Sequence, residues 1–467
     1  MPVSPARAAA FDILLRVEQE DAYASELLHS SHYGKLSPAD HGLAMELVTG
    51  VLRWRSLLDS EISKFSSQKL EQLDAEVLIA LRMAAYQLLF LDRVPGRAAV
   101  HESVELVKRA RKRSAVPFVN AVLRKLADAP SWAKARSDNQ APTAALKGCS
   151  TENRRVLAVD IPGAETASEL SVASAHPLWI LERWIREFDY HTARQICLYD
   201  QRTPRSAIRL SDAAVEDELK QNGIELVAGS LLASARQVQS GDVTKTIAFR
   251  EGRVFIQDEA SQLVALLVGK GSNILDCCAA PGGKTRVLAA RNPDATILAV
   301  DLHPHRARLL RKLVTAKNVR VVAADVCELP VSARFDRVLA DVPCSGTGTL
   351  SRNPEIKWRL KPADLVDLQA RQAQILRSAM RQTAPGGRLV YSTCSLEWEE
   401  NADVVDRALA EDHSFRVLDC RVELERLRSE GELVWKDIES LASGPYLRTI
   451  PGVHPCDGFF AAILEKN

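Results

Sequence analysis

The sequence lacks any long uninterrupted apolar run, which excludes a membrane-spanning helix of ordinary length. Such a helix needs roughly 20 consecutive apolar residues. The nearest stretch, VLIALRMAAYQLLFL, is shorter and carries Arg82, so it predicts a buried helix. The start MPVSPARAAAFDILLRV also lacks the apolar core and the cleavage site of a signal peptide. We therefore expect a cytoplasmic protein with no membrane partner.

The sequence also lacks an excess of charge and a metal-ligand pattern. It has 61 Lys and Arg against 60 Asp and Glu, a net charge of +1, so any attraction to nucleic acid must be local. Its nine cysteines are an odd number, and no pair has the spacing of a zinc site. This predicts free thiols in a reducing compartment and no bound metal.

The 467 residues are too many for one ordinary core, and their apolar pattern changes along the chain. Residues 6–127 have long stretches without Pro or Gly and repeat apolar residues at helical spacing. After Arg250, short β-branched runs alternate with helical segments, which is typical of a parallel sheet. We predict an all-α bundle at 1–130, a linker at 131–169, a small α+β adaptor at 170–246 and an α/β domain at 247–467.

One local concentration of positive charge lies in the predicted bundle. Between residues 108 and 125 the sequence has no acidic residue and seven basic ones, namely Lys108, Arg109, Arg111, Lys112, Arg113, Arg124 and Lys125. Such a run is either a solvated helix face or a contact for an RNA backbone.

The run NILDCCAAPGGKT, residues 273–285, predicts a strand, a tight glycine turn and the start of a helix. Open α/β sheets bind ligands at such turns. A phosphate-binding loop would need glycine at Cys278, and a dinucleotide fingerprint would need a third glycine beside Gly282 and Gly283. Both patterns fail. A turn fixed by Pro281, whose glycines let the backbone approach closely, fits a nucleoside ligand without phosphates, such as S-adenosylmethionine.

Two aspartates support this interpretation. Asp301 ends the next predicted strand, where an acid can hydrogen-bond ribose hydroxyls. Asp325 ends the following strand, where it could accept a hydrogen bond from the adenine amino group. Each alone is equally well explained as a helix cap, but their places at the ends of successive strands favour the cofactor.

Two cysteines, Cys344 and Cys394, end predicted strands and would face the same crevice. A lone strand cysteine is usually a small buried hydrophobe, but polar neighbours place these two in turns. A methyl donor and a nucleophilic thiol together indicate a weakly nucleophilic target such as pyrimidine C5, activated by thiolate addition at C6. Asp341 is placed to hydrogen-bond the edge of the base, and Lys284 could support the same charge. Five cysteines look structural: Cys149, Cys197, Cys327, Cys420 and Cys456.

Three strings resemble the motifs of RNA cytosine-C5 methyltransferases: CAAPGGKT, DVPCSGTGTLSRNPEIKW and YSTCSLEWEEN. The string AVHESVELVKRARKRSAVPFVNAVLRK resembles the RNA-binding fold of the antitermination factor NusB. The combination resembles the bacterial 16S ribosomal RNA methyltransferases of the Sun or Fmu type over nearly the whole chain. It implies a NusB-like bundle, a Rossmann-like methyltransferase domain, S-adenosylmethionine as cofactor and 16S ribosomal RNA as substrate. We expect a monomer.

The resemblance also implies roles for single residues. It makes Cys394 the nucleophile and gives product release to Cys344, whereas the relatives that methylate DNA use the Pro-Cys sulfur as nucleophile. The implied cofactor contacts are Cys278, Ala279, Ala280, Pro281, Gly282, Gly283, Lys284, Asp301, Asp325 and Asp341. Asn353 and Trp358 either order the loop after Cys344 or cap and pack a helix, and packing is favoured for Trp358. Gln257–Ser261 either shapes the pocket entrance or caps a helix. Residues 412–454 match no motif.

Three other functions are compatible with parts of the sequence. The substrate could be a transfer RNA or another RNA, because the catalytic strings do not choose it. A non-catalytic RNA-binding assembly factor would keep the fold, but the intact cysteines, Asp341 and glycines argue against it. An ATP-binding protein could use Gly-Lys-Thr, but its phosphate loop lacks the first glycine.

Overall fold

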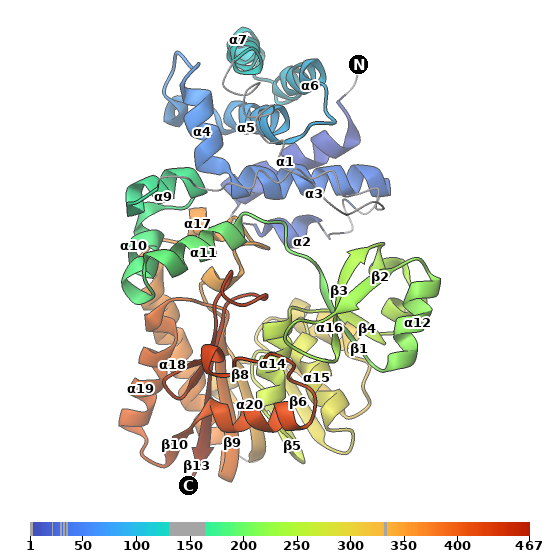
Figure 1. Ribbon diagram of the computed structural model, residues 1–467, viewed down its shortest axis with the longest axis vertical. Coiled ribbons are helices and arrows are strands. Elements are labelled where there is room, and N and C mark those ends of the chain that lie inside the picture. The colour runs from blue at the N-terminus through green and yellow to red at the C-terminus, as the bar shows by residue number, and fades with distance from the viewer. Residues whose placement is uncertain are drawn as a thin grey trace. The chain divides into compact units, whose positions relative to one another are not determined.

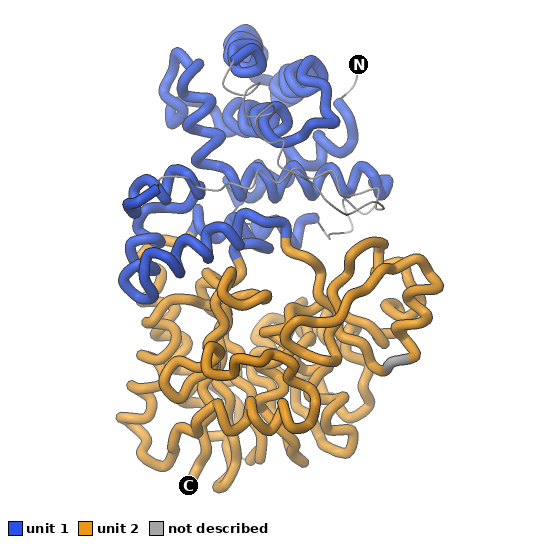
Figure 2. Tube along the Cα trace, viewed as in Figure 1, with its two compact units in different colours: residues 1–203, 350–359 blue, residues 204–349, 360–467 orange. Residues whose placement is uncertain are grey.

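The computed structural model describes residues 3–129, apart from 21, 29, 31, 32, 34 and 35, and residues 164–330 and 334–467. They form two compact units (Figure 2), one of residues 1–203 and 350–359 and the other of residues 204–349 and 360–467. The boundary at residues 203 and 204 falls inside the predicted adaptor. Most of the predicted linker, and Cys149, lie outside the described residues.

The first unit is helical (Figure 1), and its helix starts follow the sequence signals. Ser37 precedes α3 and its hydroxyl accepts a hydrogen bond from the Asp40 amide at 3.1 Å, while Pro38 occupies the first turn. The helices are α1 (Pro5–Gln19), α2 (Ala24–Leu28), α3 (Pro38–Arg53), α4 (Arg55–Ser63), α5 (Ala75–Phe90), α6 (Gly96–Arg109), α7 (Val116–Ala127), α9 (Ala167–Ser174), α10 (Leu178–Glu187), α11 (Tyr190–Asp200) and α17 (Ile356–Arg359).

Helix α5 is the apolar stretch that the sequence predicts to be buried, and the structure confirms this. It contacts α1, α3, α4, α6 and α7, and Leu81 and Met83 are fully buried. Arg82 is buried as well, because its guanidinium donates to both Asp59 carboxylate oxygens at 2.7 and 2.8 Å. In the described ranges, no helix is long and apolar enough to cross a membrane.

Residues 350–359 leave the second unit and belong to the first (Figure 2). Lys357 is buried and donates to the Arg53 carbonyl oxygen at 2.9 Å. The Trp358 indole donates to the Leu52 carbonyl oxygen at 2.5 Å. Burial lowers the pKa of Lys357 to about 7. Trp358 therefore packs within the helical unit, which is one of its two sequence interpretations.

The second unit begins with a small antiparallel sheet in the order β2-β3-β1-β4. Apolar residues of β1, α12 and β4 form its core, among them Ile208, Leu219 and Val254. The elements are β1 (Ala207–Leu210), α12 (Ala213–Gln221), β2 (Glu225–Ala228), β3 (Ala235–Ser240), α13 (Ile247–Arg250) and β4 (Val254–Ile256).

A larger mixed sheet follows, in the order β11-β12-β13-β9-β8-β5-β6-β7, with β10 also paired to β13. Strands β5 to β9 pair in parallel, as predicted, and β13 joins β9 antiparallel. The elements are α14 (Glu259–Leu267), β5 (Asn273–Asp276), α15 (Gly283–Arg291), β6 (Thr296–Asp301), α16 (Pro304–Leu313), β7 (Val319–Ala323), β8 (Phe335–Asp341), α18 (Asp364–Gln382), β9 (Thr383–Thr393), α19 (Ala402–Glu411), β10 (Phe415–Leu418), α20 (Cys420–Ser429), β11 (Ala442–Ser443), β12 (Tyr446–Thr449) and β13 (Phe459–Lys466).

Helices cover both faces of the central strands of this sheet, where successive residues point to opposite sides. On one face, Ile274 and Leu339 pack with α14, α15 and α20. On the other, Leu275 and Val338 pack with α18 and α19. Figure 1 shows α18 and α19 on one side of the strands and α14 and α15 on the other. The carboxyl ends of the parallel strands are thereby held on a rigid frame.

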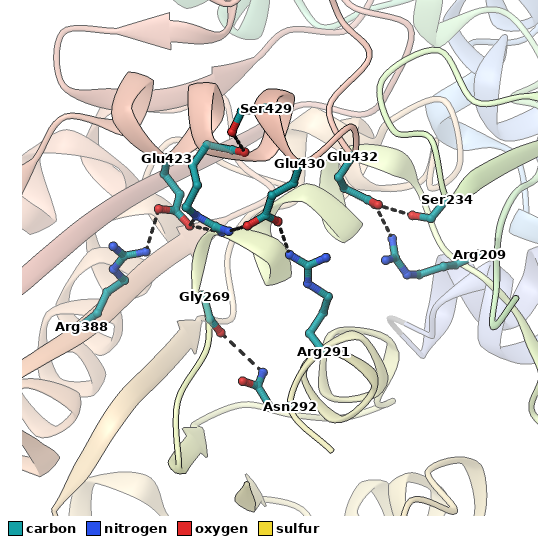
Figure 3. A network of polar contacts seen from close by, with 11 residues as sticks. Arg209, Ser234, Gly269, Arg291, Asn292, Arg388, Glu423, Ser429, Glu430 and Glu432 are labelled. Atoms are coloured by element: carbon teal, nitrogen blue, oxygen red, sulfur yellow. Dashed lines mark hydrogen bonds and ion pairs between the residues drawn. The ribbon is translucent and has the colours of Figure 1, made fainter. Parts of the chain in front are cut away.

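Residues 412–454 connect the small sheet to the main domain (Figure 3). Just after α20, Glu432 pairs with Arg209 of β1 at 3.2 Å. At the end of α20, Glu430 pairs with Arg291 of α15 at 2.8 Å. The segment therefore ties the small sheet and the helix after the glycine turn to one side of the large sheet.

Candidate active site

The predicted glycine turn follows β5, and its shape requires glycine. Gly282 has a φ of +114°, and a Cβ there would lie 2.6 Å from Val314 Cγ2 and 2.7 Å from Leu310 Cδ1. Gly283 begins α15, and a Cβ there would lie 3.0 Å from Gln257 Nε2. Neither position accepts a side chain unless its neighbours move.

The element Gln257–Ser261 includes a helix cap, as one of its two interpretations predicts, and its role at the pocket entrance stays a prediction. Gln257 packs against the glycine turn, as its closeness to Gly283 shows. Asp258 caps α14, because its carboxylate accepts a hydrogen bond from the Ala260 amide at 2.9 Å. The cap fixes the start of the helix and so places Gln257 beside the turn.

Asp301 and Asp325 differ in their surroundings. Asp301 is buried, and its carboxylate accepts hydrogen bonds from the Ala280 amide at 3.3 Å and the His303 amide at 3.1 Å. It therefore links the glycine turn to the end of β6. Asp325 accepts a hydrogen bond from the Cys327 amide at 2.8 Å and begins a short 3-10 helix. The helix-cap interpretation thus fits Asp325, and its contact with the adenine stays a prediction.

Asp276 was not singled out from the sequence, although it ends the strand that precedes the turn. It is fully buried and accepts a hydrogen bond from the Thr285 hydroxyl at 2.7 Å. Burial raises the pKa of Asp276 to about 7. An acid in the last position of an apolar strand is the sequence signal that could have found it. This hydrogen bond connects the first turn of α15 to the end of β5, on either side of the glycine turn.

Lys284 and Asp341 form an ion pair, with Lys284 Nζ 2.8 Å from Asp341 Oδ2. The Ser392 hydroxyl donates to the other Asp341 oxygen at 2.8 Å. Lys284 Nζ also lies 4.9 Å from the centre of the Phe459 ring. The structure therefore brings together two predicted residues that come from α15 and β8, beside the end of β9.

The two predicted cysteines are also brought together. Strands β8 and β9 are parallel neighbours with Asp341 opposite Ser392, so the turns that follow them meet. The Cys344 and Cys394 sulfurs are 3.2 Å apart, and both side chains are partly exposed. The hydrogen bond with Cys394, followed by burial, raises the pKa of Cys344 well above its usual range. Either thiol can be the donor of the hydrogen bond between the two sulfurs.

The turns that carry the cysteines are joined by further contacts. The Gly348 amide donates to the Cys394 carbonyl oxygen at 2.9 Å. A Cβ at Gly348 would lie 2.2 Å from the Gly458 carbonyl oxygen, so a side chain there would separate the two turns from β13. Glu400, which the sequence analysis did not single out, bonds to both turns.

Of the other described cysteines, Cys197, Cys277, Cys420 and Cys456 are buried, and Cys278 and Cys327 are half-buried. In the part of the chain that the structure describes, no group of three His, Cys, Asp or Glu residues could hold a metal ion.

Comparison with known proteins identifies the family. The family model described as 16S rRNA methyltransferase RsmB/F matches residues 263–465. A probable ribosomal RNA small subunit methyltransferase B from Bacillus subtilis is 30% identical, and the alignment covers 100% of both chains. The chain belongs to the ribosomal RNA small subunit methyltransferase B family. The putative methyltransferase Rv1407 from Mycobacterium tuberculosis is 32% identical over 100% of this chain and 97% of its own.

Membership of this methyltransferase family confirms the prediction that the cofactor is S-adenosylmethionine. The residues predicted to contact the cofactor, as well as Cys344 and Cys394, lie inside the range 263–465 that the family model matches. The crystal structure of PH0851 has the same fold, with a TM-score of 0.76, 22% identity and 100% of both chains covered. The predicted Rossmann-like domain is therefore confirmed.

The NusB family model matches residues 4–128, which confirms the predicted NusB-like bundle.

Three of the seven basic side chains between residues 108 and 125 are neutralised by carboxylates. The ion pairs are Lys108–Glu105, Arg109–Asp12 and Lys112–Asp74, at 2.7, 2.7 and 3.0 Å. Arg111, Arg113, Arg124 and Lys125 are exposed and form no ion pair with a described residue. The excess positive charge of the run is therefore smaller than the sequence indicates.

Proposed function

We propose that this chain transfers a methyl group from S-adenosylmethionine to C5 of a cytosine in 16S ribosomal RNA, through a covalent adduct with Cys394. The observation that carries the proposal is the pair of thiols 3.2 Å apart at the ends of two parallel strands. With two thiols this close, one can form the adduct with the base and the other can assist its release.

In the proposed reaction the Cys394 sulfur adds to C6 of a cytosine drawn out of its stack, which forms an S–C6 bond and moves electron density to C5. S-adenosylmethionine supplies the methyl group that C5 takes. Loss of the C5 proton to solvent restores the ring double bond and expels the Cys394 sulfur as a thiolate. We assign Cys344 to this release, because its thiol lies 3.2 Å from that sulfur and can hydrogen-bond the departing thiolate. The raised pKa of Cys344 supports this order, because a thiol that keeps its proton is a poor nucleophile.

We assign Asp341 and Lys284 to binding of the target cytosine. Their ion pair lies one residue from the start of the Pro-Cys turn and opposite Ser392, two residues before Cys394. A carboxylate and an ammonium held there can hydrogen-bond the N3 and amino edge and stabilise the charge that the adduct places on the ring. We assign Asp301, Asp325 and the turn from Cys278 to Gly283 to the cofactor.

The substrate assignment rests on the family and on the helical unit. The exposed cations Arg111, Arg113, Arg124 and Lys125 can contact phosphates, which fix position without reading sequence. The B. subtilis relative is named for ribosomal RNA of the small subunit. We therefore assign the same substrate to this chain.

The test is a search for the adduct itself. Cys344→Ala and Cys394→Ala proteins are incubated with S-adenosylmethionine and unmethylated 16S RNA, and the products are run on a denaturing gel. We expect a stalled protein–RNA adduct with Cys344→Ala and none with Cys394→Ala. An adduct only with Cys394→Ala would reverse the two roles. No adduct with either variant would contradict the covalent mechanism for this RNA.

Replacing Gly282 by alanine is expected to weaken S-adenosylmethionine binding by at least about 10-fold, because the new methyl group meets Val314 and Leu310 and must displace the turn. Gly386→Ala is the matched control: Gly386 also has a positive φ, +69°, but nothing lies within 4 Å of its would-be Cβ. Both variants carry about 1–2 kcal/mol of backbone strain. Isothermal titration with S-adenosylmethionine should separate them, and equal affinities would remove the turn from the cofactor site.

A further inference from the structure

We propose that Glu400 is a positioning residue for the cysteine pair: its buried carboxylate holds the turns after Cys344 and Cys394 in register. This inference rests on the proposed function, because it concerns the geometry of the two sulfurs. Glu400 lies in the short helical turn before α19 and has 0% of its surface exposed. In sequence it belongs to the acidic run LEWEEN, which by composition alone would be expected to lie in solvent.

One carboxylate bridges the residues that directly follow the two cysteines. Glu400 Oε1 accepts a hydrogen bond from the Ser345 amide at 2.8 Å. Glu400 Oε2 accepts a hydrogen bond from the Ser395 hydroxyl at 2.5 Å. The two serine hydroxyls are themselves 2.9 Å apart. A shift of either turn would break a hydrogen bond to the same buried charge, so the carboxylate fixes the separation of the sulfurs.

The carboxylate is itself held in place from two sides. Gln372 of α18 donates from Nε2 to Glu400 Oε1 at 2.8 Å and to the Pro343 carbonyl oxygen at 2.9 Å. The Tyr391 hydroxyl of β9 donates to the Glu400 carbonyl oxygen at 2.6 Å. Side chain and backbone of Glu400 are therefore both anchored to rigid elements, which is what a positioning residue needs.

All three donors to the carboxylate are neutral, so its charge is compensated by hydrogen bonds alone. Burying a carboxylate in this way costs free energy unless every bond is made. The charge also acts on the sulfur: after the hydrogen bond with Cys394 and burial, the nearby Glu400 charge adds to the rise in the pKa of Cys344. A merely structural acid would fix the turns without this second effect, and the two can be measured separately.

The experiment compares Glu400→Gln with Glu423→Gln. Glu423 is a buried carboxylate of the same domain that pairs with Arg388 at 3.0 Å and also with Arg426, and it makes no contact with the turns that carry the cysteines in the bonds of the described residues (Figure 3). Glutamine keeps the shape at each position but removes the charge. The measurements are kcat and KM for RNA, affinity for S-adenosylmethionine, and the pH dependence of Cys344 alkylation mapped by mass spectrometry in a Cys394→Ala background.

We expect Glu400→Gln to lower kcat by about 10- to 100-fold, with KM and cofactor affinity changed less than about 3-fold, and to shift Cys344 alkylation to lower pH. Glu423→Gln should leave the kcat and the alkylation profile unchanged. An unchanged kcat, or an alkylation profile that does not move with Glu400→Gln, would overturn the proposal. If Glu400→Gln does not fold, Ser395→Ala decides, because it removes one bond of the bridge and should lower kcat with KM unchanged.

The two proposals fail in different ways. If the Cys344→Ala protein forms no adduct with RNA, the covalent function itself is wrong. If it forms the adduct and the Glu400→Gln, Cys344→Ala double variant forms it equally fast, the function stands and only the role of Glu400 is wrong.

Discussion

Replacing Cys394 by serine is expected to lower methyl transfer by at least about 10,000-fold while S-adenosylmethionine binds within about 2-fold of its normal affinity. A serine hydroxyl in the same place has no thiolate form, so it cannot supply the bond to C6 that activates C5. The side chain lies beside Cys344 rather than at the glycine turn, so the cofactor contacts stay intact. Transfer of labelled methyl groups to unmethylated 16S RNA and isothermal titration measure the two quantities.

Cys420→Ala is the control for this prediction. Cys420 is a thiol of the same domain, buried at the start of α20 among apolar residues. Its loss should lower thermal stability slightly and leave the turnover within about 2-fold. More than about one per cent residual activity in Cys394→Ser would place the nucleophile elsewhere, and a parallel loss of cofactor affinity would indicate misfolding instead of lost chemistry.

The sequence was sufficient for those parts of the fold that depend on local pattern. Alternating apolar runs predicted the parallel strands, and the turn containing Gly282 was predicted because only glycine fits so tight an approach. The meeting of Cys344 and Cys394 followed from their places at the ends of strands, since parallel strands end at one edge of a sheet. The resemblance then supplied the roles, which the pattern alone left open.

Features that depend on distant contacts could not be predicted. Residues 350–359 continue a catalytic motif, yet they join the helical unit, because Lys357 and Trp358 find their partners on α3 and at its end. The pairing of Glu432 with Arg209 spans more than 200 residues of chain and left no local pattern. Glu400 was missed because an acidic run is normally solvated, and only the tertiary structure shows the hydrogen bonds that compensate its burial.

Replacing Asp341 by asparagine is expected to lower kcat by about 100- to 1,000-fold, the usual loss when a group that stabilises transition-state charge is removed. The amide keeps the shape and can still accept from Ser392, but the charge that holds Lys284 at 2.8 Å is gone. Ser392→Ala is the matched control, because it removes one neutral hydrogen bond to the same carboxylate and should cost about 10-fold at most. Single-turnover rates with saturating RNA isolate the chemical step.

A double-mutant cycle with Lys284→Met separates charge from position. If Asp341 and Lys284 act as one unit, Lys284→Met should lower the rate nearly as much as Asp341→Asn, and the double variant should be little worse than either. Losses that multiply would mean that the two residues act independently, with Lys284 serving the cofactor and Asp341 the base. Equal losses in Asp341→Asn and Ser392→Ala would contradict a role for the charge, because both variants would then act only by letting the carboxylate site move.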